Sequence, residues 1–122
     1  MTTQPISIDV LLEKYAKGEE RTLEEVQRRV ARALAAVERE PAAWEPRFLD
    51  AMRGGFIPAG RVMSAAGTDI RATLINCFVQ PVGDATLGEE DGKPGIMVAL
   101  SEAAETMRRG GGVGYDFSRI RP

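Results

Sequence analysis

The chain has 122 residues, of which 43% are hydrophobic and 28% charged, and its formal net charge is −2. This composition is typical of a folded segment no larger than one domain rather than of a disordered chain. The small net charge argues against a general nucleic-acid or membrane-surface partner. No apolar run reaches the length of a membrane span and the N-terminus lacks a signal-peptide pattern, so we expect a cytoplasmic protein without a membrane partner.

The chain contains one cysteine, Cys77, and no histidine. A single cysteine excludes an internal disulfide and a cysteine-rich metal site, and we expect no metal ligands. Without histidine, the chain cannot form a Ser-His-Asp triad or a Cys-His pair of its own. Any nucleophilic or redox chemistry must therefore pass through Cys77 or come from another chain.

Residues 1–53 are predicted to be helical. The first helix is expected over residues 8–16, with Ser7 as its N-cap and Gly18 after its end. Thr22 followed by Glu25 is a capping-box pattern that predicts the start of a second helix. Pro41 is expected to stop that helix.

The second and third helices are predicted from apolar residues at helical spacing. In the second these residues are Leu23, Val26, Val30, Leu34 and Val37. The side chains expected to face away from them are Arg28, Arg29, Arg32 and Glu38. The third helix is marked by Trp44, Phe48, Leu49 and Met52, and it is expected to end at Gly54-Gly55.

Residues 54–122 alternate between loops, strands and one helix. We expect a loop over 56–69, a strand buried on both faces over 74–82, and a solvated acidic loop over 88–95. A helix is predicted from Ile96, Ala99, Leu100, Ala103 and Met107, with glycines 110–112 ending it, and a strand over 114–120. The fold class is therefore α+β and predominantly helical. A buried strand needs neighbours that this chain does not supply, so we expect a fragment, a split-gene product or a precursor half.

Several features could carry chemistry, and each also has a purely structural interpretation. Cys77 is either a redox thiol or an inert core cysteine, and burial pattern alone favours the latter. The run RRGGGVG at 108–114 is either a long helix C-cap or a backbone that approaches a ligand closely. Asp84 is typical of a turn. Arg119 and Arg121 are either solvated or bind phosphate.

Two segments, LINCFVQPVGD at 74–84 and AETMRRGGGVGYDFSRIRP at 104–122, resemble the start of the catalytic region of adenosylcobalamin-dependent (class II) ribonucleotide reductases. IPAGRVMSAAGT at 57–68 is similar to the preceding substrate loop of that family, and residues 5–34 are similar to its helical lead-in. The resemblance implies a ten-stranded α/β barrel, with the N-terminal lead-in at 1–53 and the incomplete start of the barrel at 54–122. It also implies reduction of the ribose 2′-hydroxyl by thiyl-radical chemistry, with adenosylcobalamin bound mainly by parts of the enzyme outside this chain.

The resemblance also implies roles for individual residues. Cys77 matches the first member of the reducing cysteine pair, while its partner and the radical-bearing cysteine are absent from the chain. The substrate-binding residues would be Asn76, Gly111, Gly112, Ala59 and Gly60. The residues that bind the effector, a deoxynucleotide triphosphate, would be Asp84 and Arg121.

The implied partners are the ribonucleotide substrate, the C-terminal remainder of the reductase, a thioredoxin-like reductant and, in the complete enzyme, a second subunit of a homodimer. Because it has one cysteine, the isolated chain is expected to be inactive. The alternative is a non-catalytic module that binds nucleotide or docks to another chain.

Overall fold

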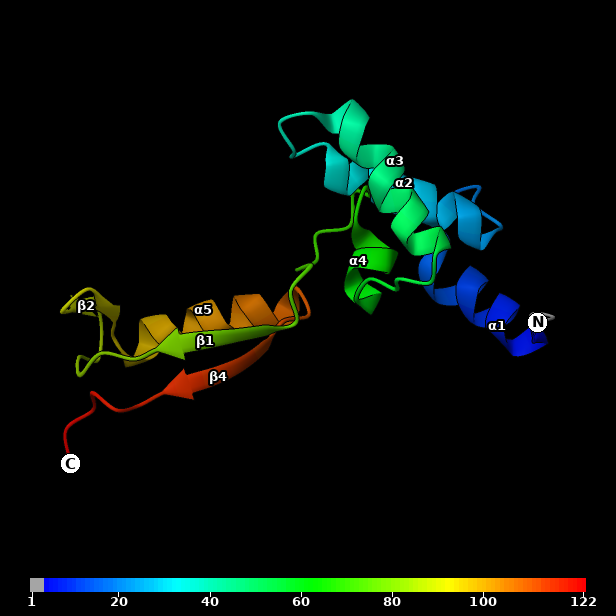
Figure 1. Ribbon diagram of the computed structural model, residues 1–122. Helices are drawn as coiled ribbons and strands as arrows, with labels where there is room; N and C mark the ends of the chain where they lie inside the picture. The colour runs from blue at the N-terminus through cyan, green and yellow to red at the C-terminus, as the bar shows by residue number, and fades with distance from the viewer. Residues whose placement is uncertain (1–3) are drawn as a thin grey trace. The chain divides into compact units, whose positions relative to one another are not determined.

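The computed structural model describes residues 4–122, which form two compact units. The first unit ends at Ile70 and the second runs from Arg71 to Pro122 (Figure 1). Helices dominate and four short strands accompany them, which confirms an α+β, predominantly helical fold. The strands in the described part of the chain do not close into a barrel. None of the helices in residues 4–122 is both long and apolar enough to cross a membrane.

The first helix begins earlier than the sequence predicts. Helix α1 spans Pro5–Val10 and continues as a π-helical turn, η1, over Leu11–Tyr15. The predicted N-cap at Ser7 is wrong, because Pro5 occupies the first turn and Gln4 is the extended cap residue. Proline suits this position since its missing N–H would have no partner there. Gly18 lies in the turn beyond the helix with a φ of 58°.

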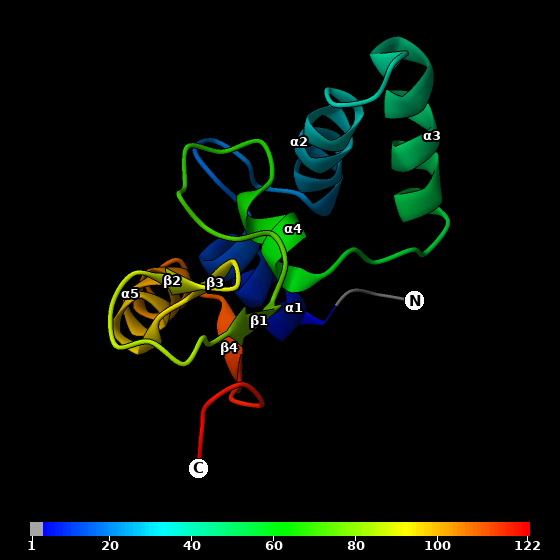
Figure 2. The same cartoon turned by 90° about the vertical axis from the view of Figure 1, so that its left-hand side faces the viewer.

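Helix α2 (Leu23–Ala35) begins at the predicted capping box. The Glu25 N–H donates to Thr22 Oγ1 over 3.3 Å, and the Thr22 N–H donates to Glu25 Oε2 over 2.9 Å. The helix ends at Ala35, so Pro41 does not terminate it but starts α3 (Pro41–Arg53). Gly54 caps α3, as predicted. The two helices pack against each other, as Figure 2 shows.

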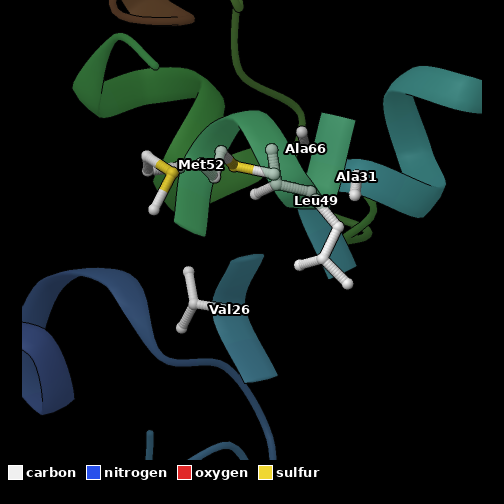
Figure 3. Packing of buried hydrophobic residues seen from close by; sticks show 7 residues of the cluster. Val26, Ala31, Leu49, Met52 and Ala66 are labelled. Atoms are coloured by element: carbon white, nitrogen blue, oxygen red, sulfur yellow. The ribbon is translucent and has the colours of Figure 1, made fainter. Parts of the chain in front are cut away.

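The core of the first unit lies where α2, α3 and a short helix meet (Figure 3). Its buried members are Val26, Val30, Ala31, Leu49, Met52, Met63 and Ala66. Helix α4 (Gly60–Ala65) lies in the segment predicted as a loop, and that prediction is wrong. The small residues of this segment are typical of a loop, but packing of its apolar side chains against α2 and η1 stabilises a helical turn. These contacts explain why the first unit extends to Ile70.

The second unit is a βαβ arrangement. Strand β1 (Cys77–Pro81) pairs in parallel with β4 (Gly112–Asp116), and α5 (Ile96–Arg108) connects them and packs against both (Figure 1). The predicted acidic loop contains a two-residue hairpin of β2 (Glu89–Glu90) and β3 (Lys93–Pro94).

Strand β1 differs from its prediction in length and burial. It begins at Cys77 rather than at residue 74, and Val79 is 79% exposed. The prediction of burial on both faces is therefore wrong for this chain. Strand β4 is the partner of β1 and α5 covers one face of the pair, while no other helix or strand of the second unit covers the opposite face.

Candidate functional site

The exposed face of the parallel pair carries Cys77. Side chains alternate across a strand, so Cys77 and Val79 lie on one face and Phe78 lies on the face packed against α5. Cys77 is a free thiol, and it is exposed within residues 4–122. A thiol on this face is open to a reaction partner.

The positions of β4 that neighbour Cys77 and Val79 on this face are both glycines. Gly112 is the strand partner of Cys77, and Gly114 is the partner of Val79. A Cβ built on Gly114 would meet no atom within 4 Å. Glycine in a strand costs stability and often marks a place where a ligand or another backbone comes close. On this face, β4 therefore presents only backbone beside the Cys77 thiol. A ligand has room to reach both the thiol and the β4 backbone.

The backbone of Asn76 aligns the glycine run with the thiol. The Gly112 N–H donates to the Asn76 carbonyl oxygen over 2.7 Å. Just before β1, the Thr73 N–H donates to the Arg109 carbonyl oxygen over 3.2 Å. These two bonds join the segment entering β1 to the segment leaving α5. The structure thus brings together the predicted residues Asn76, Cys77 and Gly112.

The three consecutive glycines have three different physical causes. Gly110 has a φ of 89° and follows the C-cap residue of α5; its N–H and that of Gly111 donate to the last carbonyl oxygens of the helix. Gly111 is buried, and a Cβ there would lie 2.8 Å from Phe78 Cε2 and 2.8 Å from Thr106 Cγ2. Gly112 is the exposed strand partner of Cys77. The run therefore does more than cap a helix.

The two arginines before the glycines both form ion pairs with the carboxylate of Glu105. Arg108 Nε lies 2.6 Å from Glu105 Oε2, and Arg109 Nε lies 2.8 Å from Glu105 Oε1. Hydrogen bonds from Arg108 and then from Arg109 lower the pKa of Glu105 from its usual 4.5 to about 2. Cations in the last turn also suit the helix dipole.

The two predicted effector residues meet at the other end of the second unit. Arg121 Nε donates to Asp84 Oδ2 over 2.6 Å, and Arg121 Nη2 donates to the Asp84 carbonyl oxygen over 3.3 Å. The Arg121 side chain is 75% exposed, so solvent or a ligand can reach it. An adjacent pocket of about 290 Å³ is lined by Gly83, Asp84, Glu90, Asp91 and Arg119.

Ala59 and Gly60 lie in the first unit. Ala59 is the extended N-cap residue of α4, and Gly60 is the first residue of that helix. A Cβ on Gly60 would be 3.5 Å from Tyr15 Oη, which is an ordinary contact. Their role at the substrate stays a prediction.

Arg29 is a residue whose importance the sequence did not indicate. It was expected to face solvent, but its side chain is 13% exposed and its Nε lies 2.8 Å from Glu20 Oε1. Its Nη2 donates to the carbonyl oxygens of Tyr15 and Met63 over 3.0 Å each, and Nη1 donates to that of Ala66. Position 29 borders the apolar stripe at 26 and 30, which was the one available signal. Arg29 therefore fixes the segment that resembles the substrate loop.

Comparison with known proteins places the chain in a family. The family model described as "Ribonucleotide reductase, all-alpha domain" matches residues 1–71. Two strains of Mycobacterium tuberculosis, CDC 1551 / Oshkosh and H37Rv, have proteins named vitamin B12-dependent ribonucleoside-diphosphate reductase. Each is 35% identical over 127 residues, covering 95% of this chain and 17% of the relative. No solved structure matches the chain.

A protein of the same name from Thermoplasma acidophilum is 39% identical over 77 residues, which is 62% of this chain and 9% of the relative. The chain thus spans about a sixth of the length of the mycobacterial relatives. The family match covers more than half of the chain. The chain therefore belongs to the ribonucleotide reductase family, with the all-alpha domain in residues 1–71.

Proposed function

We propose that this chain is the N-terminal part of a ribonucleotide reductase that converts ribonucleotides to deoxyribonucleotides, and that it supplies one redox cysteine and part of the substrate and effector sites. The observation that carries the proposal is the pairing of an exposed thiol, Cys77, with Gly112 on β4, where Gly112 and Gly114 place no side chain beside the thiol. The names of the relatives support a ribonucleoside diphosphate as the substrate.

The proposed chemistry gives Cys77 one half of a two-electron reduction. Two thiols lose two electrons and two protons and form a disulfide. The C2′–O bond breaks, the hydroxyl leaves as water with one of the protons, and the other proton and the two electrons form the new C2′–H bond. The chain has one cysteine, so the second thiol and the radical-bearing cysteine must come from another part of the enzyme. A thioredoxin-like dithiol then reopens the disulfide by exchange.

The open face beside Cys77 suits a substrate that must touch both sulfur and backbone. Gly112 and Gly114 leave room for a ribose to approach within contact distance of β4. The Asn76 carbonyl oxygen is occupied by the Gly112 N–H, so Asn76 would act on the substrate through its exposed side chain. Ala59, Gly60 and Gly111 are the further residues of the proposed substrate site.

Adenosylcobalamin is the proposed cofactor, and it supplies the initial radical when bound to the complete enzyme. The proposal places its binding site mainly in parts of the enzyme outside this chain. We therefore assign no residue of this chain to the cofactor.

Asp84 and Arg121 are proposed to contribute to an effector site for a deoxynucleotide triphosphate. Arginine presents a planar fork of donors that grips phosphate oxygens in pairs. A carboxylate such as Asp84 accepts hydrogen bonds from sugar hydroxyls or from a base. The direct pairing of the two residues beside a pocket supports a shared role.

The proposal extends to the surroundings of the chain. Residues 54–122 would begin a ten-stranded barrel, and the exposed apolar residues Ile75, just before β1, and Val79, on the Cys77 face, would be covered by further strands. The complete enzyme would be a homodimer.

Reconstitution tests this function directly. The purified chain would be combined with the part of a vitamin B12-dependent reductase that follows the aligned segment, together with adenosylcobalamin, a dithiol and a ribonucleoside diphosphate. We expect deoxyribonucleotide formation by the mixture and none by either part alone. Nucleotide binding without turnover in the mixture would instead favour the non-catalytic module.

A further inference from the structure

Phe78 lies against the glycine run from the face of β1 opposite to Cys77. A Cβ on Gly111 would stand 2.8 Å from Phe78 Cε2, 2.9 Å from Phe78 Cδ2 and 2.8 Å from Thr106 Cγ2. Carbon atoms pack at about 3.5–4.0 Å, so nothing larger than glycine fits between the ring and the methyl group. The φ of Gly111 is not positive, in contrast to that of Gly110. Packing therefore dictates this glycine, and backbone conformation does not.

Gly111 occupies the gap between the Phe78 ring and the Thr106 methyl group, which we call the passage. Two hydrogen bonds hold the chain on either side of it. The Gly111 N–H donates to the Thr106 carbonyl oxygen of α5 over 2.9 Å, and the Gly112 N–H donates to the Asn76 carbonyl oxygen over 2.7 Å. One residue thus links the end of α5 to the strand register that sets Gly112 opposite Cys77. A displacement of Gly111 away from the Phe78 ring must therefore also displace the backbone of Gly112.

We propose that Phe78 is a positioning residue for the reductase reaction, with the Thr106 methyl group as its counterpart. The ring and the methyl group fix the position of Gly111, and Gly111 in turn holds the backbone of Gly112 beside the Cys77 thiol. Phe78 touches no reacting atom and acts only through Gly111. The inference rests on the proposed function, because alignment matters for catalysis only if a substrate meets Cys77 and Gly112 together.

The first test measures amide hydrogen exchange at Gly112 by NMR in this chain. Gly111→Ala should accelerate exchange at Gly112 about tenfold or more, because it forces the run out of the passage. Gly114→Ala is the matched control, since its new Cβ meets no atom within 4 Å, and it should leave the exchange rate unchanged or lower it. Unchanged exchange at Gly112 in Gly111→Ala would overturn the proposal.

A mutant cycle tests whether the Phe78 ring and the Thr106 methyl group are together the cause. In a Phe78→Leu/Thr106→Ser background the passage is wider, so adding Gly111→Ala should accelerate exchange less than it does in the wild-type chain. An equal acceleration in both backgrounds would overturn the role of Phe78 and of its counterpart Thr106. If Gly111→Ala unfolds α5, as faster exchange at Ala99 and Ala103 would show, Phe78→Leu alone serves as the test. It should accelerate exchange at Gly112 while the two alanines stay protected, and no acceleration there would count against the proposal.

The reconstituted enzyme supplies the functional readout. Phe78→Leu should lower kcat about tenfold, as misalignment of reacting groups does, while the rate of Cys77 alkylation by iodoacetamide in the isolated chain stays within about twofold of wild type. A normal kcat with faster exchange at Gly112 would show that the passage is structural only. If the wild-type mixture does not turn over, the proposed function fails while the exchange results remain interpretable.

Discussion

Replacing Arg29 by methionine should remove most of the stability of the first unit. Methionine keeps the apolar stem but deletes the ion pair with Glu20 and the hydrogen bonds to the carbonyl oxygens of Tyr15, Met63 and Ala66. The Glu20 side chain is 15% exposed and would lose its ion-pair partner, keeping only the hydrogen bond from the Lys17 N–H. Removing one member of a buried pair costs about 3–5 kcal/mol. A unit of this size is stable by roughly 3–10 kcal/mol, so the loss is a large fraction of the total.

Arg28→Met is the matched control on the neighbouring residue. The Arg28 side chain is 56% exposed and pairs with Glu24 over 2.8 Å, so its loss should cost no more than about 1 kcal/mol. Urea unfolding monitored by the fluorescence of Trp44 reports on the first unit, because Trp44 is the sole tryptophan and lies in α3. Equal free energies of unfolding for the two variants, within about 0.5 kcal/mol, would refute the reasoning.

Three further predictions concern the second unit. In the reconstituted enzyme, Arg121→Ala should weaken binding of a deoxynucleotide triphosphate by about 1.5–3 kcal/mol while basal reduction is mostly retained, and unchanged affinity in isothermal titration would remove the residue from the effector site. The pKa of Glu105 is lowered from 4.5 to about 2, so its ion pairs stabilise α5 above pH 4.5 and are lost as the pH falls through about 2; an NMR titration midpoint near 4.5 would contradict this. Hydrogen exchange should be slower at Val26 and Val30 than at Val79, because β1 has one strand partner and an uncovered face; equally strong protection would indicate a self-sufficient domain.

The sequence predicted those helix ends that are fixed by hydrogen bonds between residues close together in the chain. The capping box of Thr22 and Glu25 was recognisable because both hydrogen bonds lie within four residues. The end of α5 at Gly110 was recognisable for the same reason. Helix α4 was not, because its stability comes from packing against distant segments rather than from its own residues.

For the parts of the candidate site that depend on tertiary contacts, the sequence indicated which residues were unusual but not the physical reason. The pattern indicated that the glycine run was unusual, yet the reason for Gly111 lies in the ring of Phe78 across the sheet. The apolar segment around Cys77 predicted burial, but burial requires neighbouring strands that residues 4–122 do not contain. Arg29 carries a charge, and its charge alone predicted exposure until its four partners were located.

The most direct test of the central claim is the turnover of the reconstituted reductase with Cys77→Ser. Serine keeps the size of the side chain but cannot form a disulfide. We expect deoxyribonucleotide formation with the physiological dithiol reductant to fall to background, while the variant chain folds and assembles like the wild type. Turnover by the Cys77→Ser enzyme at the wild-type rate would contradict the assignment of this thiol to the reduction.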